Sequence, residues 1–320
     1  MAIIAGIDEA GFGPVLGPLL VSVSVFEVPT AAADECMWRM LAGAVTRKAL
    51  RRSPALPVAD SKALRVRSSL LHLERGVLGL LAQAGARPTS LSELLRRLAP
   101  QALREMPRSP WYSHADLPLP RQADRRDIDL RANGLALAME RRGIKLQSVR
   151  AEPILAADFN RLVRATRNKS VALFGVVSRM IDYVFQTYAG KQPTRIVIDR
   201  QGGRIRYLHH LQRMFQGARI RILDESQQRS AYLIEQGPRS AEIRFQLNGE
   251  DACLPVALSS MVSKYVRELL MELLNNWWAQ RIRGLKPTAG YYVDGRRFLH
   301  DIAPAVAAEG IDPSMLVRCR

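Results

Sequence analysis

The chain of 320 residues has little of what would tie it to a membrane, to disulfide bonds or to a cysteine metal site. No run approaches the roughly 18 continuous apolar residues that a transmembrane helix needs. The N-terminus lacks the basic segment and cleavage site of a signal peptide. The three cysteines, Cys36, Cys253 and Cys319, are odd in number and far apart, which argues against a disulfide framework. We therefore expect no membrane association and a cytoplasmic location.

Acidic residues are also scarce relative to basic ones. Thirty Asp and Glu stand against 47 Lys and Arg, which gives a formal net charge of +17. Such an excess favours a polyanionic partner, because binding neutralises phosphates and releases their counterions. We therefore expect nucleic acid as the partner. We also expect the chain to be a monomer. An anionic membrane surface is the weaker alternative, since no basic amphipathic helix stands apart from the rest of the sequence.

Apolar segments of strand and helix character alternate along the chain, which is typical of an α/β fold. The expected strands are 2–7, 14–28, 144–154, 195–199, 218–223 and 243–247. The expected helices are 31–50, one starting at Asp60 or Ser61, 91–98, 168–188, 205–215 and 254–282. Six prolines between 84 and 129 predict a loop-rich insertion. The predicted domains are a core in two parts (1–75 and 144–283), an insertion (76–143) and a C-terminal helical extension (284–320).

The first expected strand ends in two adjacent acids, Asp8 and Glu9, followed by Gly11 and Gly13. Because a carboxylate is costly to desolvate, acids seldom follow a buried strand unless they are paired or bound to a metal. The two glycines let the backbone approach a ligand closely and aim amide N–H groups at it. A carboxylate pair beside such a turn suits metal-assisted chemistry on a phosphodiester. The alternative is an ordinary strand end followed by a tight turn.

Two further acids are positioned to join this pair. Asp199 follows another short apolar strand, and Asp251 precedes the long helix 254–282. Open α/β sheets place their sites at the carboxyl ends of strands, so we expect these acids to meet. Clustered carboxylates repel, and a hard cation such as Mg²⁺ or Mn²⁺ relieves the repulsion. The alternative is a set of unrelated helix caps and loop acids.

Several sequence blocks together resemble the type 2 ribonucleases H, the ribonuclease HII and HIII family. The blocks are Gly6–Pro14 with Gly17-Pro18, Ala59–Lys62 with Leu64, Val197–Asp199, Glu250–Ala252 with Pro255, Ser259–Lys264 with Arg267-Glu268, and Gly290–Tyr292. They occur in the family's order and span most of the chain, and the segment 75–145 lies outside them. Singly, only the first block is specific.

The resemblance implies a ribonuclease H-like fold, with a mixed five-stranded sheet flanked by helices. It implies cleavage of RNA in RNA–DNA hybrids, or at ribonucleotides embedded in duplex DNA, with 5′-phosphate and 3′-hydroxyl ends. Asp8, Glu9, Asp199 and Asp251 would ligate two Mg²⁺ or Mn²⁺ ions. The amides of Gly11 to Gly13 would touch the ribose 2′-hydroxyl, the group that distinguishes RNA from DNA.

The remaining substrate contacts follow from the same blocks and from one basic stretch. Tyr291 or Tyr292 would stack on a sugar, and packing in the core or at the surface is the alternative. Arg200 and Arg204, which flank two glycines after the strand 195–199, would grip the nucleic-acid backbone, or else belong to a solvated face. The full predicted substrate-binding set is Gly11, Phe12, Gly13, Ser61, Lys62, Arg200, Arg204, Lys264, Tyr291 and Tyr292. For Ser61 and Lys62, expected to hold phosphate, the alternative is a helix start with a solvated lysine.

Two departures from the family pattern keep other functions open. Phe12 stands between the glycines where the family usually has a basic residue, and an aromatic ring cannot pair with a phosphate. The interval from Asp251 to Lys264 is one residue short, which could shift the fourth acid. The alternatives are a ribonuclease H-like nuclease specific for DNA structures, or a nucleic-acid-binding homologue without turnover.

Overall fold

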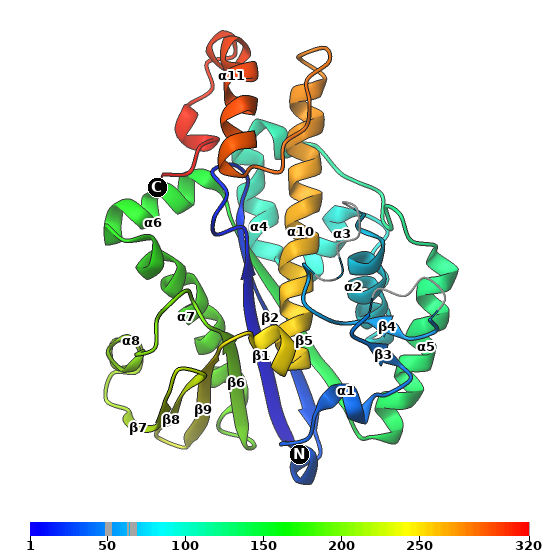
Figure 1. The fold of residues 1–320 in the computed structure, drawn as a ribbon, viewed down its shortest axis with the longest axis vertical. Helices are drawn as coiled ribbons and strands as arrows, with labels where there is room; N and C mark the ends of the chain where they lie inside the picture. The colour runs from blue at the N-terminus through cyan, green and yellow to red at the C-terminus, as the bar shows by residue number, and fades with distance from the viewer. Residues whose placement is uncertain (49–52, 63, 65–68, 320) are drawn as a thin grey trace.

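The computed structural model describes residues 1–48, 53–62, 64 and 69–319. Its main feature is a mixed sheet with helices on both faces, which confirms the predicted fold class (Figure 1). In spatial order the strands are β5 (Lys145–Ile154), β2 (Leu19–Val28), β1 (Ala2–Ala10), β6 (Thr194–Asp199), β9 (Arg239–Gln246), β8 (Arg229–Gln236) and β7 (Arg219–Glu225). Strand β1 is antiparallel to β2 and parallel to β6, and β6 is parallel to β9. A separate short pair joins β3 (Val45–Thr46) to β4 (Leu56–Pro57).

The described sheet has seven strands, so the expected count of five is wrong. The difference lies at one edge, where β7, β8 and β9 form an antiparallel meander. Strand β8 was not predicted. It pairs with β9 from Arg229 to Gln236, and the chain turns between them at Gly237, whose φ is 57°. Tyr232 and Ile234 are buried in β8, so the meander extends the sheet and its core together.

Two helical layers cover the sheet. The α-helices are α1 (Met37–Met40), α2 (Leu71–Gln83), α3 (Leu91–Leu98), α4 (Pro100–Glu105), α5 (Arg125–Arg141), α6 (Ala156–Thr166), α7 (Lys169–Tyr188), α8 (Leu208–Met214), α9 (Gly249–Ala252), α10 (Leu254–Ala279) and α11 (Tyr292–Ala308). Helix α10 lies along β1 on one face, and α7 covers the other face (Figure 1). The predicted helix 168–188 is confirmed as α7, whose N-cap Asn168 accepts hydrogen bonds from two backbone amides.

Two predicted helices are wrong. In 31–50, the described residues hold only the end of a 3₁₀ turn, the four-residue α1 and the two-residue β3. Gly43 has a φ of 87° that a continuous helix cannot accommodate; residues 49–50 of this prediction lie outside the described ones. Residues 60–62 and 64 form a turn in which Asp60 Oδ1 accepts a hydrogen bond from the Lys62 amide at 2.9 Å. Residues 63 and 65–68 lie outside the described ones, and the next helix starts at Leu71.

The segment expected to be loop-rich, 84–129, contains α4 and the start of α5 in addition to the predicted α3, and α2 precedes it. Helices α2 and α5 pack against each other, and α2 also packs on α10. Glu74 of α2, which is fully buried, accepts hydrogen bonds from the backbone amides of Arg121, Gln122 and Ala123 and from the Tyr265 hydroxyl. This carboxylate fastens the chain before α5 to the core. The predicted domain boundaries stay predictions.

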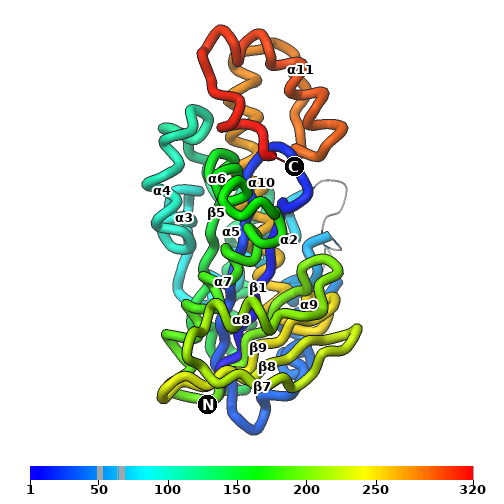
Figure 2. The backbone as a smooth tube through the Cα atoms, turned by 90° about the vertical axis from the view of Figure 1, so that its left-hand side faces the viewer, coloured from blue at the N-terminus to red at the C-terminus, as the bar shows by residue number. Residues whose placement is uncertain are grey.

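Helix α11 and the C-terminal segment lie at the end of the molecule where the chain leaves β1 (Figures 1 and 2). A short bridge between Leu16 and Val317 joins the two segments, which are 301 positions apart. None of the helices described here is long and apolar enough to cross a membrane.

Candidate functional site

Helix α10 packs closely on strand β1 because the strand has a glycine at the contact. A Cβ added to Gly6 would lie 2.1 Å from the backbone nitrogen of Val256. Two serines of the helix then bond to the strand. Ser259 Oγ donates to the Gly6 carbonyl at 2.8 Å, and Ser263 Oγ donates to the Asp8 carbonyl at 3.2 Å. These contacts hold the first half of α10 against the acid pair.

The sheet brings two of the predicted acids to one place. Asp8 is buried in β1, and its Oδ1 accepts a hydrogen bond from the Glu9 amide at 2.7 Å. In the parallel pairing of β1 with β6, Ile7 lies opposite Ile198. The next residue of each strand is Asp8 or Asp199, so the two acids are neighbours at the carboxyl ends of adjacent strands.

A fourth carboxylate comes from α9, the single turn that follows β9. Asn248 adopts a left-handed conformation with φ 51°, and the Gly249 amide then donates to Asp199 Oδ1 at 2.7 Å. The next residue, Glu250, lies close enough for its charge to raise the pKa of Asp199. Glu250 Oε2 is buried and has no hydrogen-bond partner among the described residues.

Asp8, Glu9, Asp199 and Glu250 are hereafter the carboxylate cluster. Burial, followed by the charges of its neighbours, raises the pKa of Asp8 well above its ordinary value. Burial and the charges of Asp199 and Glu250 raise the pKa of Glu9 to about 8. Burial and the charge of Glu250 raise the pKa of Asp199 to about 7. Ionisation of the whole cluster is therefore unfavourable unless a cation compensates it.

The loop before α2 contributes a positive charge and a hydroxyl to the cluster. Partial burial opposes the charge on Lys62, but the fields of Asp60 and of the carboxylate cluster outweigh it and raise the lysine's pKa. Ser61 is buried beside it and accepts a hydrogen bond from Ser260 Oγ of α10 at 3.2 Å. The block around Ser61 and Lys62 thus lies at the cluster, and its role in holding phosphate stays a prediction.

Asp251, predicted as the fourth acid, is not brought to the cluster. Its side chain is exposed, and its backbone amide donates to the Asn248 carbonyl at 3.0 Å. Successive helical residues point about 100° apart, so only one of two adjacent acids on α9 can face Asp199. The sequence signal for Glu250 was the interval from Asp251 to Lys264, which is one residue shorter than the family pattern. The interval from Glu250 to Lys264 is one residue longer and so has the expected length.

The donor chemistry of the cluster fits a hard divalent cation. Within the described part of the chain, no three His, Cys, Asp or Glu side chains converge in a ready-made metal-binding group. The cluster nevertheless offers only carboxylate oxygens, the ligands that Mg²⁺ and Mn²⁺ prefer. Its raised pKa values and the unpartnered buried oxygen of Glu250 are what a missing counter-charge would produce.

The glycine turn, residues 11–17, is held by two buried arginines. Gly11 has a φ of 85°, and an added Cβ would lie 2.5 Å from Arg267 Nε. Arg318, which is 1% exposed, donates from Nη2 to the Phe12 carbonyl at 2.9 Å. Burial and the nearby charge of Arg267 lower the pKa of Arg318 to about 9. The C-terminal segment therefore shapes the turn beside the cluster.

The two residues after Gly11 differ in their surroundings. Gly13 is exposed, and an added Cβ would have no neighbour within 4 Å. Phe12 is half-buried against the core between the sheet and α7. Lys169 Nζ, at the start of α7, lies 5.6 Å from the centre of the Phe12 ring. A positive charge thus stands beside the turn, although the turn carries none itself.

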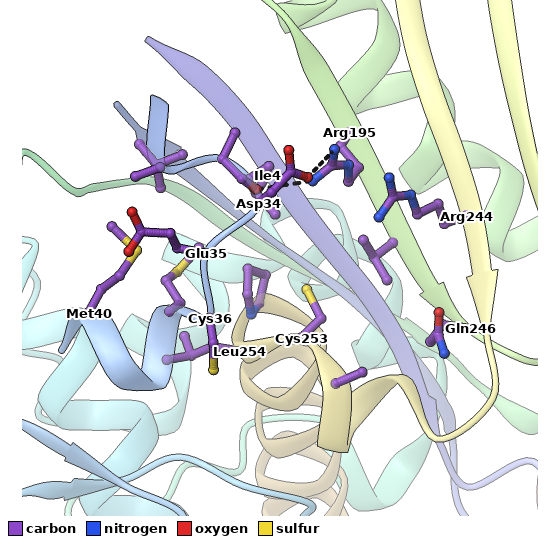
Figure 3. A pocket seen from close by; sticks show the side chains of 17 residues that line it. Ile4, Asp34, Glu35, Cys36, Met40, Arg195, Arg244, Gln246, Cys253 and Leu254 are labelled. Carbon is purple, nitrogen blue, oxygen red and sulfur yellow. Dashed lines mark hydrogen bonds and ion pairs between the residues drawn. The ribbon is translucent and has the colours of Figure 1, made fainter. Parts of the chain in front are cut away.

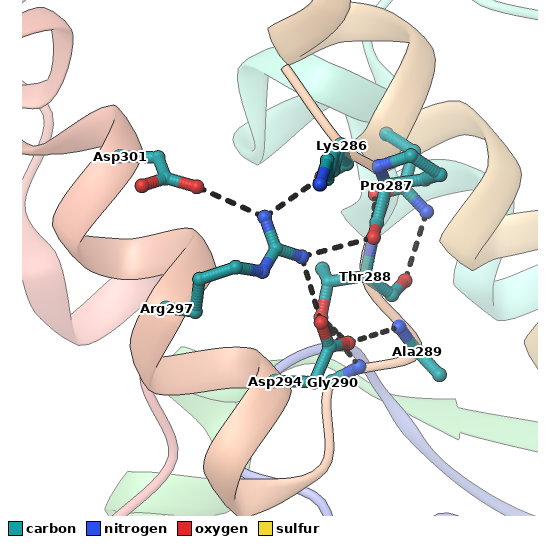
Figure 4. Close-up of polar contacts among 9 residues, drawn as sticks. Lys286, Pro287, Thr288, Ala289, Gly290, Asp294, Arg297 and Asp301 are labelled. Atoms are coloured by element: carbon teal, nitrogen blue, oxygen red, sulfur yellow. Dashed lines mark hydrogen bonds and ion pairs between the residues drawn. The ribbon is translucent and has the colours of Figure 1, made fainter.

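The loop before α11 is braced by Asp294 of that helix. Its carboxylate accepts hydrogen bonds from Thr288 Oγ1 at 2.6 Å and from the Ala289 amide at 3.0 Å (Figure 4). Arg297 donates to the same carboxylate at 2.7 Å and also to backbone carbonyls of the loop. These bonds fix the path of the chain up to residue 290.

This brace leaves two tyrosines exposed beside the glycine turn. The Gly290 carbonyl accepts a hydrogen bond from the Val15 amide at 2.8 Å, which joins loop and turn. Tyr291 and Tyr292 follow and are 50% and 40% exposed. The Arg267 guanidinium lies 6.0 Å from the centre of the Tyr291 ring. Both rings are therefore partly exposed beside the turn, and the Tyr292 hydroxyl accepts a hydrogen bond from Arg296 Nη1 at 2.9 Å.

Two of the predicted substrate-binding residues are engaged within the protein. Arg200 donates to the Gln227 carbonyl at 2.6 Å and to the Ser226 carbonyl at 3.2 Å, so it holds the turn between β7 and β8. Lys264 forms an ion pair with Glu268 at 2.6 Å along α10. Both side chains are therefore paired inside the protein.

Arg195, in the same basic stretch as Arg200, is also neutralised inside the protein. It lines a cavity of about 170 Å³ at the start of α10, together with Cys36 and Cys253 (Figure 3). Its guanidinium pairs with Asp34 at 2.8 Å and with Glu242 at 3.1 Å. The charge of this stretch is therefore only partly available to a partner.

No protein-family model and no curated protein matches the sequence. Among solved structures, ribonuclease HII in its PCNA complex from Archaeoglobus fulgidus is similar over 99% of this chain and 94% of that chain, at 16% identity and a TM-score of 0.44. Ribonuclease H2 from Pyrococcus horikoshii is similar over 98% and 92%, at 13% identity and a TM-score of 0.40. "Bst" ribonuclease HIII in complex with Mn²⁺ is similar over 99% and 66%, at 14% identity and a TM-score of 0.43.

Proposed function

We propose that the protein is a metal-dependent endonuclease that cuts RNA in RNA–DNA hybrids, or at ribonucleotides embedded in duplex DNA. The observation that carries the proposal is the carboxylate cluster, four acids next to the glycine turn, of which Asp8 is buried and the other three are half-buried. Clustered carboxylates, three of which (Asp8, Glu9 and Asp199) have raised pKa values, are costly to keep in a fold, so their presence favours a catalytic role. The predicted products have 5′-phosphate and 3′-hydroxyl ends.

Asp8, Glu9, Asp199 and Glu250 would hold two Mg²⁺ or Mn²⁺ ions. The chemistry supplied by bound ions is activation of a water molecule and neutralisation of charge on the phosphate. Glu250 takes the place that the sequence assigned to Asp251, because it lies at Asp199 while Asp251 is exposed.

The other residues around the cluster would bind and orient the substrate. Lys62, whose charge is stabilised by the carboxylates, would hold the phosphate that is cut. The amide N–H groups of Gly11 and Gly13 would meet the ribose 2′-hydroxyl. The exposed rings of Tyr291 and Tyr292 would stack on the neighbouring sugar or base.

The test is cleavage of a DNA duplex that contains one ribonucleotide, in the presence of Mg²⁺ or Mn²⁺. Asp8→Asn and Glu250→Gln should each lower the cleavage rate at least about 100-fold, as loss of a charge-stabilising group typically does. Asp251→Asn is the matched control, because it makes the same chemical change one residue away on an exposed side chain. An equal loss of cleavage rate in Glu250→Gln and Asp251→Asn would refute the assignment of Glu250 to the cluster.

A DNA-directed activity is the second candidate, favoured by the packing of Phe12 against the core. A turn without a side-chain cation has one contact fewer with which to select the phosphate beside a ribonucleotide. Cutting of branched all-DNA substrates in preference to the ribonucleotide duplex would support this candidate. Binding of both substrates without cutting would support a homologue that has lost turnover.

A further inference from the structure

The loop that follows β6 contains buried polar atoms that have no hydrogen-bond partner in the described structure. They are Arg200 Nε, both polar side-chain atoms of Gln201, and Arg204 Nη1. All of them lie within five residues of Asp199. Buried polar groups in native proteins are normally satisfied by protein or by water, so such a concentration indicates a place where a polar ligand or solvent enters.

An open cavity of about 740 Å³ lies beside this loop. One wall consists of residues 203–206, and the other of residues 225–227 in the turn between β7 and β8. We call this cavity the loop pocket. Arg200 holds the second wall in position by donating to the carbonyls of Ser226 and Gln227. An arginine that appeared from the sequence to be a phosphate ligand thus builds the wall of a neighbouring pocket.

The first wall presents a fixed guanidinium. Arg204 Cζ lies 5.5 Å from the centre of the Tyr207 ring and 5.8 Å from that of Phe174. Contact with two aromatic faces limits the conformations of the side chain, so little mobility would be lost on binding. Its Nη1 is left with unfilled donor capacity. Planar guanidinium donors of this kind match the oxygens of a phosphate.

The charge of the loop pocket favours an anion. Arg204 and Arg206 line it, and Glu225 is the acid that opposes them. Arg206 Nε is 3.9 Å from Glu225 Oε2, and the arginine side chain is 89% exposed, so this pair is weak. The carboxylate cluster is close, because the backbone amide of Gln201, two residues after Asp199, donates a hydrogen bond to the hydroxyl of Tyr207 behind Arg204 at 3.2 Å.

We propose that the loop pocket binds a backbone phosphate of the nucleic-acid duplex, away from the phosphate that is cut. The inference rests on the proposed function for its choice of a nucleic acid as the anion. Arg204 would supply oriented hydrogen bonds, and Arg206 would supply charge at the rim. This contact would set the path of the strand relative to the carboxylate cluster, and it does not depend on the base sequence.

The test measures binding of an all-DNA duplex to Arg204→Ala and Arg206→Ala without divalent metal, so that no cleavage occurs. Removing an arginine that neutralises one phosphate should lower the slope of log affinity against log salt by about 0.9. The expected result is a decrease of this size in each variant and an affinity at low salt reduced several-fold. Arg204→Lys should recover part of the affinity, because the charge remains while the planar donor set is lost.

Arg142→Ala is the matched control, since it removes an exposed arginine next to α5, across the sheet from α8 (Figure 1). A slope that changes no more in Arg204→Ala and Arg206→Ala than in Arg142→Ala would overturn the proposal. Arg206→Ala removes a solvent-exposed side chain, so it keeps the test valid if Arg204→Ala fails to fold. Failure of the proposed function is a separate result: wild-type protein would leave the ribonucleotide duplex uncut while the slope still fell in the pocket variants.

Discussion

Replacing Gly6 with alanine should destabilise the protein by about 3 kcal/mol or more, at the upper end of the cost of overpacking a core. The added Cβ would lie 2.1 Å from the Val256 nitrogen and 2.2 Å from the Pro255 carbonyl carbon, where ordinary contact begins at 3.4 Å. Helix α10 would therefore have to retreat by about 1.3 Å at this point. Both neighbours are backbone atoms, so no side-chain rotation relieves the clash.

The same retreat should disturb the carboxylate cluster. It would lengthen the bonds from Ser259 to the Gly6 carbonyl and from Ser263 to the Asp8 carbonyl, now 2.8 and 3.2 Å. Because α9 leads directly into α10, Glu250 would move with the helix relative to Asp199. We therefore expect molecules of the variant that remain folded to cleave more slowly than the wild type.

Thermal unfolding followed by circular dichroism measures the first effect. A loss of about 3 kcal/mol corresponds to a melting temperature lower by roughly 4–5 °C, since unfolding 320 residues carries an entropy of about 0.67 kcal/mol/K. Gly134→Ala is the control: it lies in α5, and its added Cβ would have no neighbour within 4 Å. That change should stabilise the helix by up to about 1 kcal/mol. Equal melting temperatures for Gly6→Ala and the wild type would refute the close packing of α10 on β1.

Three further predictions concern buried carboxylates. Asp8→Asn should lower cleavage in Mg²⁺ at least about 100-fold, yet without metal at pH 8 it should raise the melting temperature, because it removes a repelled and desolvated acid. A lower melting temperature would contradict the repulsion. Folding raises the pKa of Glu9 from 4.5 to about 8 and that of Asp199 from 3.8 to about 7, so the folded state keeps protons that the unfolded chain releases. The stability of the metal-free protein should thus fall as the pH rises from about 4 to 8, and Mg²⁺ should restore it at pH 8. Denaturant titrations that give the same unfolding free energy at every pH would exclude this link between protonation and stability. Glu74→Gln should lower the free energy of unfolding by about 2–4 kcal/mol, since an amide cannot accept all the hydrogen bonds that the carboxylate accepts. The activity of folded protein should be unchanged. Chemical unfolding measures the loss, and Glu140→Gln, at an exposed position, is the control.

The elements around the site were the most predictable part of the fold. Strands β1 and β6 are short apolar runs that end in acids, and both lie in the middle of the sheet. Their patterns reflect burial on both faces, which is a local property of the sequence. The long helices α7 and α10 were predictable for the same reason. Where an element is buried through its own apolar residues, its hydrophobic pattern is enough to predict it.

Other elements depend on contacts that a local pattern does not contain. Strand β8 exists because it pairs along its whole length with β9, and its mixed polar sequence resembles an exposed loop. Residues 31–50 have helical composition, but Trp38 and Met40 turn into the core and Gly43 breaks the path. Glu74 looks like an ordinary acid on a helix, and its role follows only from the backbone amides that surround it.

The choice between Glu250 and Asp251 shows most clearly what a pattern leaves undecided. Both acids fit a site that precedes the long helix, and their chemistry is the same. The geometry that separates them is set upstream: β9 ends opposite Asp199, Asn248 reverses the chain at a φ of 51°, and the Gly249 amide binds Asp199 at 2.7 Å. An added Cβ at Gly249 would come within 3.3 Å of the Asp199 carboxylate, so this close approach favours glycine. Once these bonds are made, the direction of the next side chain follows from helix geometry alone, and it is Glu250 that meets the cluster.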